Sequence, residues 1–298
     1  MIQYTLKEWV NEWLYTYKRI MVKPSTFDSY LEYAKSVDCN KRIDELVTAD
    51  IQSMINKMVV EGKQLSTIKH MLTVTRQSLY KARALGLIRH LDCLDNLELP
   101  KANPKRIPAL NSAQAQLIFD NAHKSYYGNF FCALVLTGCR VGELIGLTWK
   151  NVDWFNECIY ISDTDYRGNL QAVKTNSGVR CLPFYSQLKA ILKQQYKLTG
   201  HLSSGRVFVN TLGKKIVYNT ALKCWHGFCN SIGLWQPLGF HTLRHTFAYT
   251  AIKNGVPVKV VSAWLGHADV RITLQIYDHV YDSDMRQAAE RLAEVFEA

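Results

Sequence analysis

A cluster of prolines about one third of the way along the sequence limits how this chain can fold. Three prolines fall within nine residues: Pro100, Pro104 and Pro108. Proline fits neither a helix interior nor a central strand, because its ring fixes φ and its nitrogen carries no hydrogen. Three basic residues lie among them: Lys101, Lys105 and Arg106. We therefore predict a basic linker over residues 92–108, between a domain over 1–91 and a second domain over 109–298.

The first ninety residues have the pattern of four helices. Thr5 and Glu8 have the spacing of a capping box, and apolar residues follow at helical intervals. The residues expected at the starts of the next three helices are Ser25, Asp50 and Ser66. The fourth helix is expected to stop at Gly86. This pattern predicts a small helical domain.

The rest of the chain mixes helices with a few strands. Asn111 and Gln114 mark a helix start, and helical patterns continue through Leu147 with a break at Gly138. The apolar spacing then becomes that of short strands, over residues 158–162, 170–173 and 179–184. Helical patterns resume at Ser186. We expect a mainly α fold with a small antiparallel sheet, composed of a helical domain and a mixed α/β domain.

The charge balance favours an anionic partner. The 298 residues include 36 Lys and Arg against 25 Asp and Glu, a net charge of +11. The apolar runs are shorter than the roughly 20 residues that cross a bilayer, and the first residues lack the features of a signal peptide. The eight cysteines form no CxxC pair, which suits a reducing compartment. We expect a cytoplasmic protein with no membrane segment.

The predicted fourth helix carries a basic stripe made of Lys69, Arg76 and Arg83. These residues recur every seven positions, so they project from nearly one side of the helix. One interpretation is a solvated face, for which exposed charge is ordinary. The other is contact with phosphates, which requires a single sign of charge. Residues 62–91 contain six basic residues and no acidic one, which favours the second interpretation.

Several polar residues in the second domain stand at unusual positions. In chain order they are Arg140, Glu143, His241, Arg244, His267 and Tyr277. Arg140 and Glu143 lie one helical turn apart, and His241 and Arg244 open an apolar helix. His267 follows a Leu-Gly pair, and Tyr277 comes ten residues after it. Taken singly, each has an ordinary explanation, such as a surface ion pair of small worth or a core tyrosine.

Together and in this order they resemble the tyrosine recombinase (phage integrase) family. The matching stretches are Thr137-Gly-Cys-Arg-Val-Gly-Glu-Leu with Leu147-Thr-Trp149, Lys174-Thr-Asn-Ser-Gly-Val-Arg180, His241-Thr-Leu-Arg-His245, Leu265-Gly-His267 and Tyr277-Asp-His279. The first hundred residues look like the family's core-binding domain, and the rest looks like its catalytic domain. Cys139 stands where the family more often has an apolar residue, a departure expected to affect packing only. The resemblance does not extend to the arm-binding domain with which longer integrases begin.

The resemblance implies a site-specific recombinase or integrase that cleaves and rejoins DNA through a 3′-phosphotyrosyl intermediate and a Holliday junction. It implies integration and excision of a mobile element or phage, without a metal or other cofactor. The implied partners are double-stranded recombination sites, a homotetramer on synapsed DNA and accessory DNA-bending or excision factors.

The two arginines suit the chemistry that the resemblance implies for them. A phosphodiester under attack concentrates negative charge, and arginine presents a rigid planar fork that stays charged at any working pH. Arg140 and Arg244 are therefore expected to hold the nonbridging oxygens, and Glu143 is expected to orient Arg140.

The remaining roles also follow from the resemblance. Tyr277 is expected to attack phosphorus, and Lys174 is expected to protonate the leaving 5′-hydroxyl. His241 and His267 are expected to bind phosphoryl oxygens and manage the tyrosine proton. Because the covalent link preserves the ester bond, rejoining needs neither ATP nor a metal.

Three alternatives remain open at this point. The same chemistry could resolve replicon dimers, as Xer recombinases do, or relax supercoils, as a type IB topoisomerase does. A third alternative is a non-enzymatic zinc module, because Cys224, Cys229, His241 and His245 approach the spacing of a Cys2His2 site. Against it, the two cysteines fall in an amphipathic helical pattern and not on a hairpin.

The last predicted helix, over 282–298, has an apolar seam. Its members are Met285, Ala289, Leu292 and Phe296. This spacing gives one apolar face, which is expected to pack either on its own domain or, as tails in the family can, on a neighbouring protomer.

Overall fold

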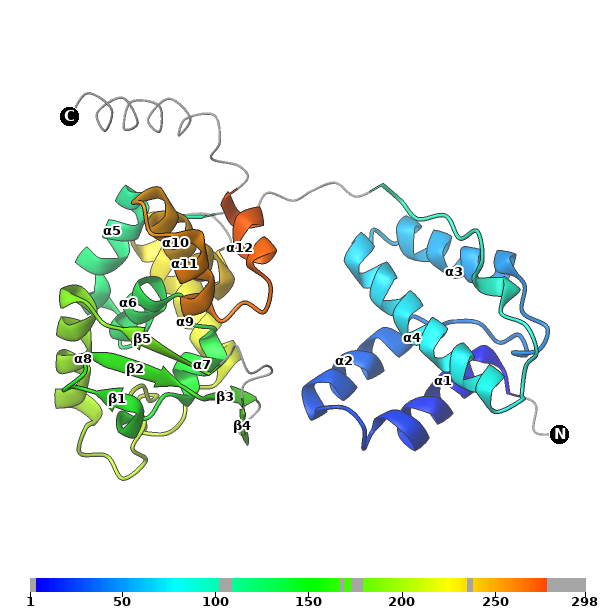
Figure 1. Ribbon diagram of the computed structural model, residues 1–298, viewed down its shortest axis with the longest axis horizontal. Helices are drawn as coiled ribbons and strands as arrows, with labels where there is room; N and C mark the ends of the chain where they lie inside the picture. The colour runs from blue at the N-terminus through cyan, green and yellow to red at the C-terminus, as the bar shows by residue number, and fades with distance from the viewer. Residues whose placement is uncertain (1–3, 102–108, 167–168, 173–178, 235–237, 278–298) are drawn as a thin grey trace. The chain divides into compact units, whose positions relative to one another are not determined.

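The computed structural model describes residues 4–101, 109–166, 169–172, 179–234 and 238–277 (Figure 1). The chain divides into two compact units, Met1–Lys105 and Arg106–Ala298, which we call the N-terminal and C-terminal units. Lys174 and the predicted tail helix over 282–298 lie outside the described residues. Within the described ranges, no helix is both long enough and apolar enough to cross a membrane.

The N-terminal unit is helical, as predicted. Its described elements are α1 (Leu6–Trp13), the π-helical turn η1 (Leu14–Lys18), α2 (Pro24–Ala34), α3 (Thr48–Val60), α4 (Leu65–Ala84) and the 3-10 turn η2 (Asp92–Leu94). The capping box at the start of α1 is confirmed: the Thr5 hydroxyl accepts a bond from the Glu8 N–H at 3.3 Å, and the Glu8 carboxylate accepts one from the Thr5 N–H at 2.9 Å. The π-helical turn has no counterpart in the predicted pattern.

Three helices begin slightly before the residues at which they were predicted to start. Helix α2 begins at Pro24, whose fixed φ suits the first turn. Helix α3 begins at Thr48, so Asp50 is its third residue and not its cap. The Asp50 carboxylate accepts a hydrogen bond from the Val47 N–H at 2.9 Å, just before the first turn. Helix α4 begins at Leu65, one residue before Ser66, and ends at Ala84. The predicted stop at Gly86 is confirmed, because that residue has a left-handed φ of +72°.

The core of the N-terminal unit lies between α1 and the inward face of α4. Trp9 and Trp13 of α1 are each 2% exposed. The Trp9 indole donates a 2.7 Å hydrogen bond to the backbone carbonyl of Ser78, which joins α1 to α4. This packing fixes which face of α4 is turned toward solvent.

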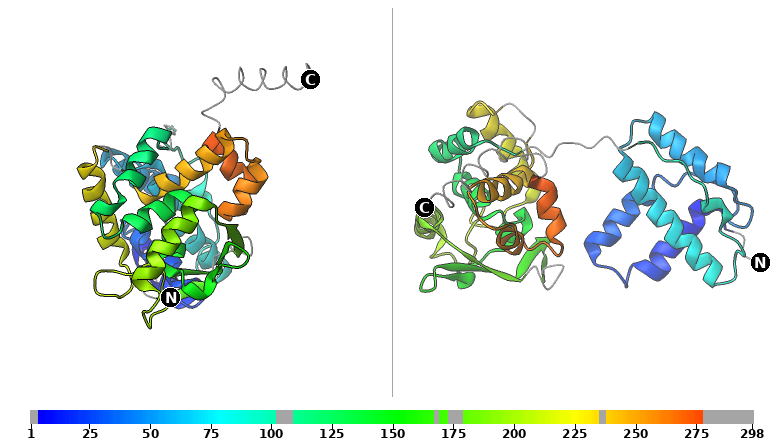
Figure 2. Two further views of the ribbon diagram at one scale, coloured as in Figure 1. Left: turned by 90° about the vertical axis from the view of Figure 1, so that its left-hand side faces the viewer. Right: turned by 45° about the horizontal axis from the view of Figure 1, so that its top comes forward.

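The C-terminal unit is also mainly helical. Its described helices are α5 (Ser112–Asp120), α6 (Gly128–Thr137), α7 (Val141–Gly146), α8 (Ser186–Thr199), α9 (Tyr218–Ser231), α10 (Phe240–Lys253), α11 (Val258–Leu265) and α12 (Val270–Tyr277), with 3-10 turns η3 (Ala122–Lys124) and η4 (Trp149–Asn151). Helix α6 is buried along most of its length, and α5, α8 and α10 pack around it. Helices α10, α11 and α12 contact one another and lie together in the orange-to-red part of Figure 2.

Two small antiparallel sheets interrupt the helices. Strands β1 (Val152–Asp153), β2 (Cys158–Ile161) and β5 (Arg180–Pro183) form one sheet in the order β1-β2-β5, with Ile161 opposite Arg180. Strands β3 (Asp163–Tyr166) and β4 (Asn169–Ala172) form the other. The three predicted strands are confirmed as β2, β4 and β5. The strands before and after Lys174 belong to different sheets, because β4 pairs with β3 and β5 pairs with β2.

Candidate active site

Two chain reversals position the candidate active site. Helix α6 ends at Gly138 and α11 ends at Gly266, with φ of +60° and +66°. A Cβ at Gly138 would lie 2.5 Å from a ring carbon of Phe247, so only glycine fits there. Arg140 caps α7 two residues after the first reversal, and His267 directly follows the second.

Arg244 of α10 connects the ends of α6 and α11 by hydrogen bonds to their backbones. It is 4% exposed, and its guanidinium donates hydrogen bonds to the carbonyls of Gly138 at 2.8 Å and Leu265 at 2.6 Å. Burial first, and then the charge of Arg140, lower the pKa of Arg244 to about 10. The side chain therefore remains positively charged at neutral pH.

Arg140 lies beside Arg244 and is more open to solvent. Its side chain is 42% exposed. It donates to a Glu143 carboxylate oxygen at 2.8 Å and to the Gly266 carbonyl at 3.1 Å. Glu143 also accepts the backbone N–H of Arg140 at 2.9 Å. The carboxylate thus fixes both the backbone and the guanidinium of Arg140, while much of that side chain can be reached from outside.

A third arginine, Arg180, completes this group. It is the first residue of β5, its side chain is 6% exposed, and it donates to Glu143 at 2.7 Å. Arg180 was not among the site residues predicted from the sequence, although it ends the Lys174 stretch. The strand alternation contained a signal, because Arg180 lies on the same side of β5 as the buried Leu182. A charged residue at such a position needs a partner.

Glu143 stays ionised in this environment. Its side chain is 1% exposed, and burial alone would raise its pKa. The hydrogen bonds and positive charges of Arg180 and Arg140 outweigh that effect, so the pKa of the carboxyl is lowered. The same ion pair outweighs the effect of burial on Arg180 and raises the pKa of its guanidinium.

The histidines near the arginines are neutral at pH 7. Burial and then the nearby arginine charges lower the pKa of His267 to about 4. The pKa of His241 is lowered by partial desolvation and by the charges of Arg244 and Arg140. His245 also has a pKa of about 4, and its Nδ1 has no hydrogen-bond partner among the described residues.

His267 contacts the helix that ends at Tyr277. Its Nδ1 lies 2.8 Å from the hydroxyl of Thr273, a fully buried residue of α12. Tyr277 is the last residue of α12. The structure therefore brings together Arg140, Glu143, His241, Arg244 and His267 and places the end of α12 in the same group of elements, whereas Lys174 lies outside the described residues.

The basic stripe lies on the solvent face of α4. Lys69, Arg76 and Arg83 are all exposed, and none of the three takes part in an ion pair recorded for the described part of the chain. The Arg83 guanidinium lies over the Tyr80 ring, 5.5 Å from its centroid. This arrangement leaves the three charges available to a partner.

The cysteines of the zinc alternative are on a helix. Cys224 and Cys229 both belong to α9, and Cys229 is buried. In the ranges that the structure covers, no group of three or more His, Cys, Asp or Glu side chains could hold a metal ion.

Cys139, which stands where the family more often has an apolar residue, is buried. Its sulfur lies 3.8 Å from the Arg180 guanidinium.

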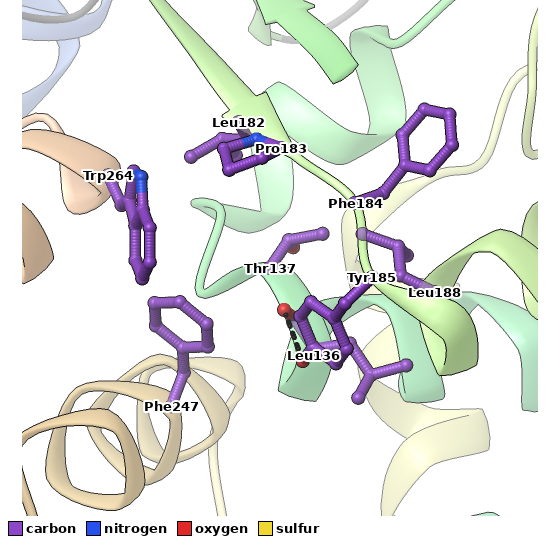
Figure 3. A pocket seen from close by; sticks show the side chains of 9 residues that line it. All are labelled: Leu136, Thr137, Leu182, Pro183, Phe184, Tyr185, Leu188, Phe247 and Trp264. Carbon is purple, nitrogen blue, oxygen red and sulfur yellow. Dashed lines mark hydrogen bonds between the residues drawn. The ribbon is translucent and has the colours of Figure 1, made fainter. Parts of the chain in front are cut away.

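An apolar hollow lies beside the candidate active site (Figure 3). It has a volume of about 240 Å³ and is lined by Leu136, Thr137, Leu182, Pro183, Phe184, Tyr185, Leu188, Phe247 and Trp264. A second hollow of about 430 Å³ shares Leu136, Tyr185, Phe247 and Trp264 with it. The Tyr185 hydroxyl donates to the Leu136 carbonyl at 3.0 Å, and burial raises the pKa of Tyr185 to about 12. The hollow is suited to apolar side chains and not to phosphoryl chemistry.

The sequence matches known recombinases. The Phage integrase family matches residues 104–284. A tyrosine recombinase XerC-like protein of Caldanaerobacter subterraneus subsp. tengcongensis is 28% identical, over 98% of this chain and 83% of its own length. The integrase of Staphylococcus phage L54a is 23% identical, over 95% of this chain and 92% of its own.

Solved integrase structures share the fold. The Tn1549 transposon integrase in complex with a circular intermediate DNA has a TM-score of 0.80 at 20% identity, covering 97% of this chain and 99% of that one. A lambda integrase tetramer bound to a Holliday junction has a TM-score of 0.73 at 18% identity, covering 92% and 77%.

Proposed function

Because this chain belongs to the phage integrase family of tyrosine recombinases, and therefore cleaves and rejoins DNA, we propose that it integrates and excises a mobile element or phage. The observation that supports the strand cleavage is the group of Arg140, Arg244 and His267 around the ends of α6 and α11. Relatives named as integrases and transposases support a mobile element. The XerC-like relative, which aligns with nearly the whole chain, supports dimer resolution as the second candidate.

In the proposed reaction the two arginines bind the scissile phosphate. Arg244 is held by two backbone carbonyls and Arg140 by Glu143, so both charges are in place before DNA arrives. Donors preorganised around developing charge are usually the largest single contribution to catalysis. The partial exposure of Arg140 gives the phosphate access to this pair.

Tyr277 is the proposed nucleophile. Its phenolic oxygen attacks phosphorus, the 3′-phosphotyrosyl bond forms, and the bond to the 5′-oxygen breaks. Lys174 donates a proton to that leaving oxygen, and the reverse reaction with another 5′-hydroxyl rejoins the strand. One strand of each partner is exchanged at a time, through a Holliday junction, and the bond exchange requires neither ATP nor a metal.

The histidines act beside the phosphate in this proposal. When the Thr273 hydroxyl donates to Nδ1 of His267, the neutral ring keeps its proton on Nε2. That proton can be donated to a phosphoryl oxygen. His241, near both arginines, serves the same phosphate and accepts the tyrosine proton.

The proposed assembly is a homotetramer that holds two double-stranded recombination sites, with accessory DNA-bending or excision factors. We propose that the apolar seam of residues 282–298, a segment outside the described residues, packs either on its own domain or on a neighbouring protomer.

Covalent trapping tests the proposed function. Wild-type protein is mixed with labelled duplexes from the ends of candidate mobile elements, each nicked near the expected cleavage point. The short fragment released after cleavage diffuses away, so rejoining fails and a covalent protein–DNA complex accumulates. We expect this complex with element ends and their insertion targets. Trapping only on replicon dimer sites would support dimer resolution, and plasmid relaxation without strand exchange would support a topoisomerase.

The basic stripe of α4 is proposed to contact DNA phosphates. Replacing Lys69, Arg76 and Arg83 with alanine should weaken binding to every DNA sequence. It should also reduce the slope of log K against log salt by roughly 0.9 for each lost contact. Binding isotherms at several salt concentrations measure both effects.

A matched control removes the same number of positive charges elsewhere on the N-terminal unit. Lys7, Lys35 and Lys57 are exposed and paired with carboxylates. Their replacement by alanine should leave the salt slope nearly unchanged. A slope that is equal in the stripe variant and in wild type would show that the stripe is only a solvated face.

A further inference from the structure

Three arginines from distant parts of the chain bind three consecutive carbonyls at the end of α11. Arg180 donates through Nε to the Trp264 carbonyl, Arg244 donates to Leu265 and Arg140 donates to Gly266. The last carbonyls of a helix have no partner within the helix and carry partial negative charge. Cationic side chains satisfy these groups here, directly before His267.

We propose that Arg180 is a positioning residue for DNA cleavage: it orients the Arg140 guanidinium through Glu143 and fixes the segment before His267. The inference rests on the function proposed above. It adds Arg180 to the residues that the reaction needs, although Arg180 itself is buried and is not proposed to touch DNA.

The first part of the argument is the way Glu143 is shared. One carboxylate oxygen accepts from the Arg140 side chain at 2.8 Å and from Arg180 at 3.3 Å. The other accepts from the Arg140 backbone at 2.9 Å and from Arg180 at 2.7 Å. Arg180 therefore donates to both oxygens of the carboxylate that binds Arg140, so it helps to fix the position of Glu143 relative to the Arg140 guanidinium.

The second part of the argument is charge. Three arginines and one ionised carboxylate leave two net positive charges around the proposed phosphate site. Without Arg180, the full charge of Glu143 acts on Arg140 alone and competes with the phosphate for that guanidinium. Arg180 thus leaves Arg140 free to neutralise charge on the substrate.

The third part of the argument is the connection to His267. Arg180 and Arg244 bind the carbonyls of neighbouring residues, Trp264 and Leu265. Because each carbonyl has its own donor, the backbone that leads into His267 is held at two successive points. A shift at Trp264 would therefore move the histidine as well as Arg140.

The experiment compares Arg180→Met with wild type on the duplex that wild type cleaves in the trapping assay. Methionine keeps an unbranched chain and removes the charge and the hydrogen bonds. We expect the single-turnover cleavage rate to fall by about 100-fold, as a misplaced catalytic group commonly causes, while DNA affinity changes little. Arg180→Lys keeps the charge without the fork and should give a smaller loss, which provides a second measure if the Met variant unfolds.

A neutral substrate separates positioning from simple structural support. A methylphosphonate at the scissile position replaces one charged nonbridging oxygen with a methyl group, so cleavage depends less on arginine charge. The deficit of Arg180→Met should therefore shrink to a few-fold on this duplex. Arg206→Met is the matched control, since Arg206 also donates to a backbone carbonyl, that of Ile145, at 3.0 Å, and it should cleave as wild type does.

Two results would overturn the inference. One is a folded Arg180→Met variant that cleaves the phosphodiester at the wild-type rate. The other is an equal deficit on both substrates, which would identify Arg180 as a structural residue only. A wild-type protein that forms no covalent complex with any duplex would instead contradict the proposed function, and the inference with it.

Discussion

Replacing Tyr277 with phenylalanine should abolish the covalent protein–DNA complex. The substitution removes only the phenolic oxygen that forms the bond to phosphorus, so no other group in the proposed mechanism can take its place. DNA binding should persist, because binding depends on the phosphate contacts and not on the nucleophile. Denaturing gels of labelled, nicked duplex measure the adduct, and native gels measure binding.

The control for this prediction is Tyr249→Phe. Tyr249 lies on α10 in the same unit, with the Lys253 amine 5.7 Å from its ring centroid, and its variant should form the adduct at the wild-type rate. Adducts that persist at the wild-type level in Tyr277→Phe would mean that another residue attacks the phosphate. Peptide mapping of the trapped complex would then identify that residue.

Removal of either proposed phosphate ligand should reduce cleavage by orders of magnitude. For Arg140→Ala we expect a loss of roughly 100- to 1,000-fold in the single-turnover rate, or about 3 kcal/mol, the usual effect of deleting one preorganised donor. Arg140 is 42% exposed, so its removal should change the melting temperature little. The measurement is cleavage of nicked duplex at saturating protein.

Arg244→Ala should lose both activity and stability. Its removal leaves the buried carbonyls of Gly138 and Leu265 without this donor, at a cost of about 1 to 3 kcal/mol for each unsatisfied group. Thermal unfolding of the variant separates this loss from the catalytic one. If a folded Arg140→Ala or Arg244→Lys protein cleaves within threefold of wild type, that arginine is not a ligand of the phosphate.

The parts of the fold governed by local chemistry could be predicted from the sequence. The capping boxes at Thr5 and Asn111 depend on residues three positions apart, and both are formed. The mainly helical class and the small antiparallel sheet are likewise confirmed by the structure and by the integrase folds it resembles. Such features need no information from distant parts of the chain.

The features that were missed depend on a partner segment and not on a pattern of their own. Strand β1 has two residues, and β3 reads Asp-Thr-Asp-Tyr, so neither shows an apolar alternation. Each becomes a strand because a neighbour supplies its hydrogen bonds. Arg180 was missed for the same reason, since Glu143, the partner that makes its burial tolerable, lies 37 residues earlier in the chain.

The connections that hold the arginines also set an order of events during protein synthesis. Arg140 donates to a carbonyl 126 residues further along, and Arg244 donates to one 21 residues further along. Because domains emerge from the ribosome and fold from the N-terminus onward, α4 and its exposed charges are complete long before residues 264–266 are made. An unfinished chain that ends before these residues therefore lacks the backbone that holds its arginines in place. Under the proposed function, strand cleavage therefore has to wait until residues 264–266 have been made and have folded against these arginines.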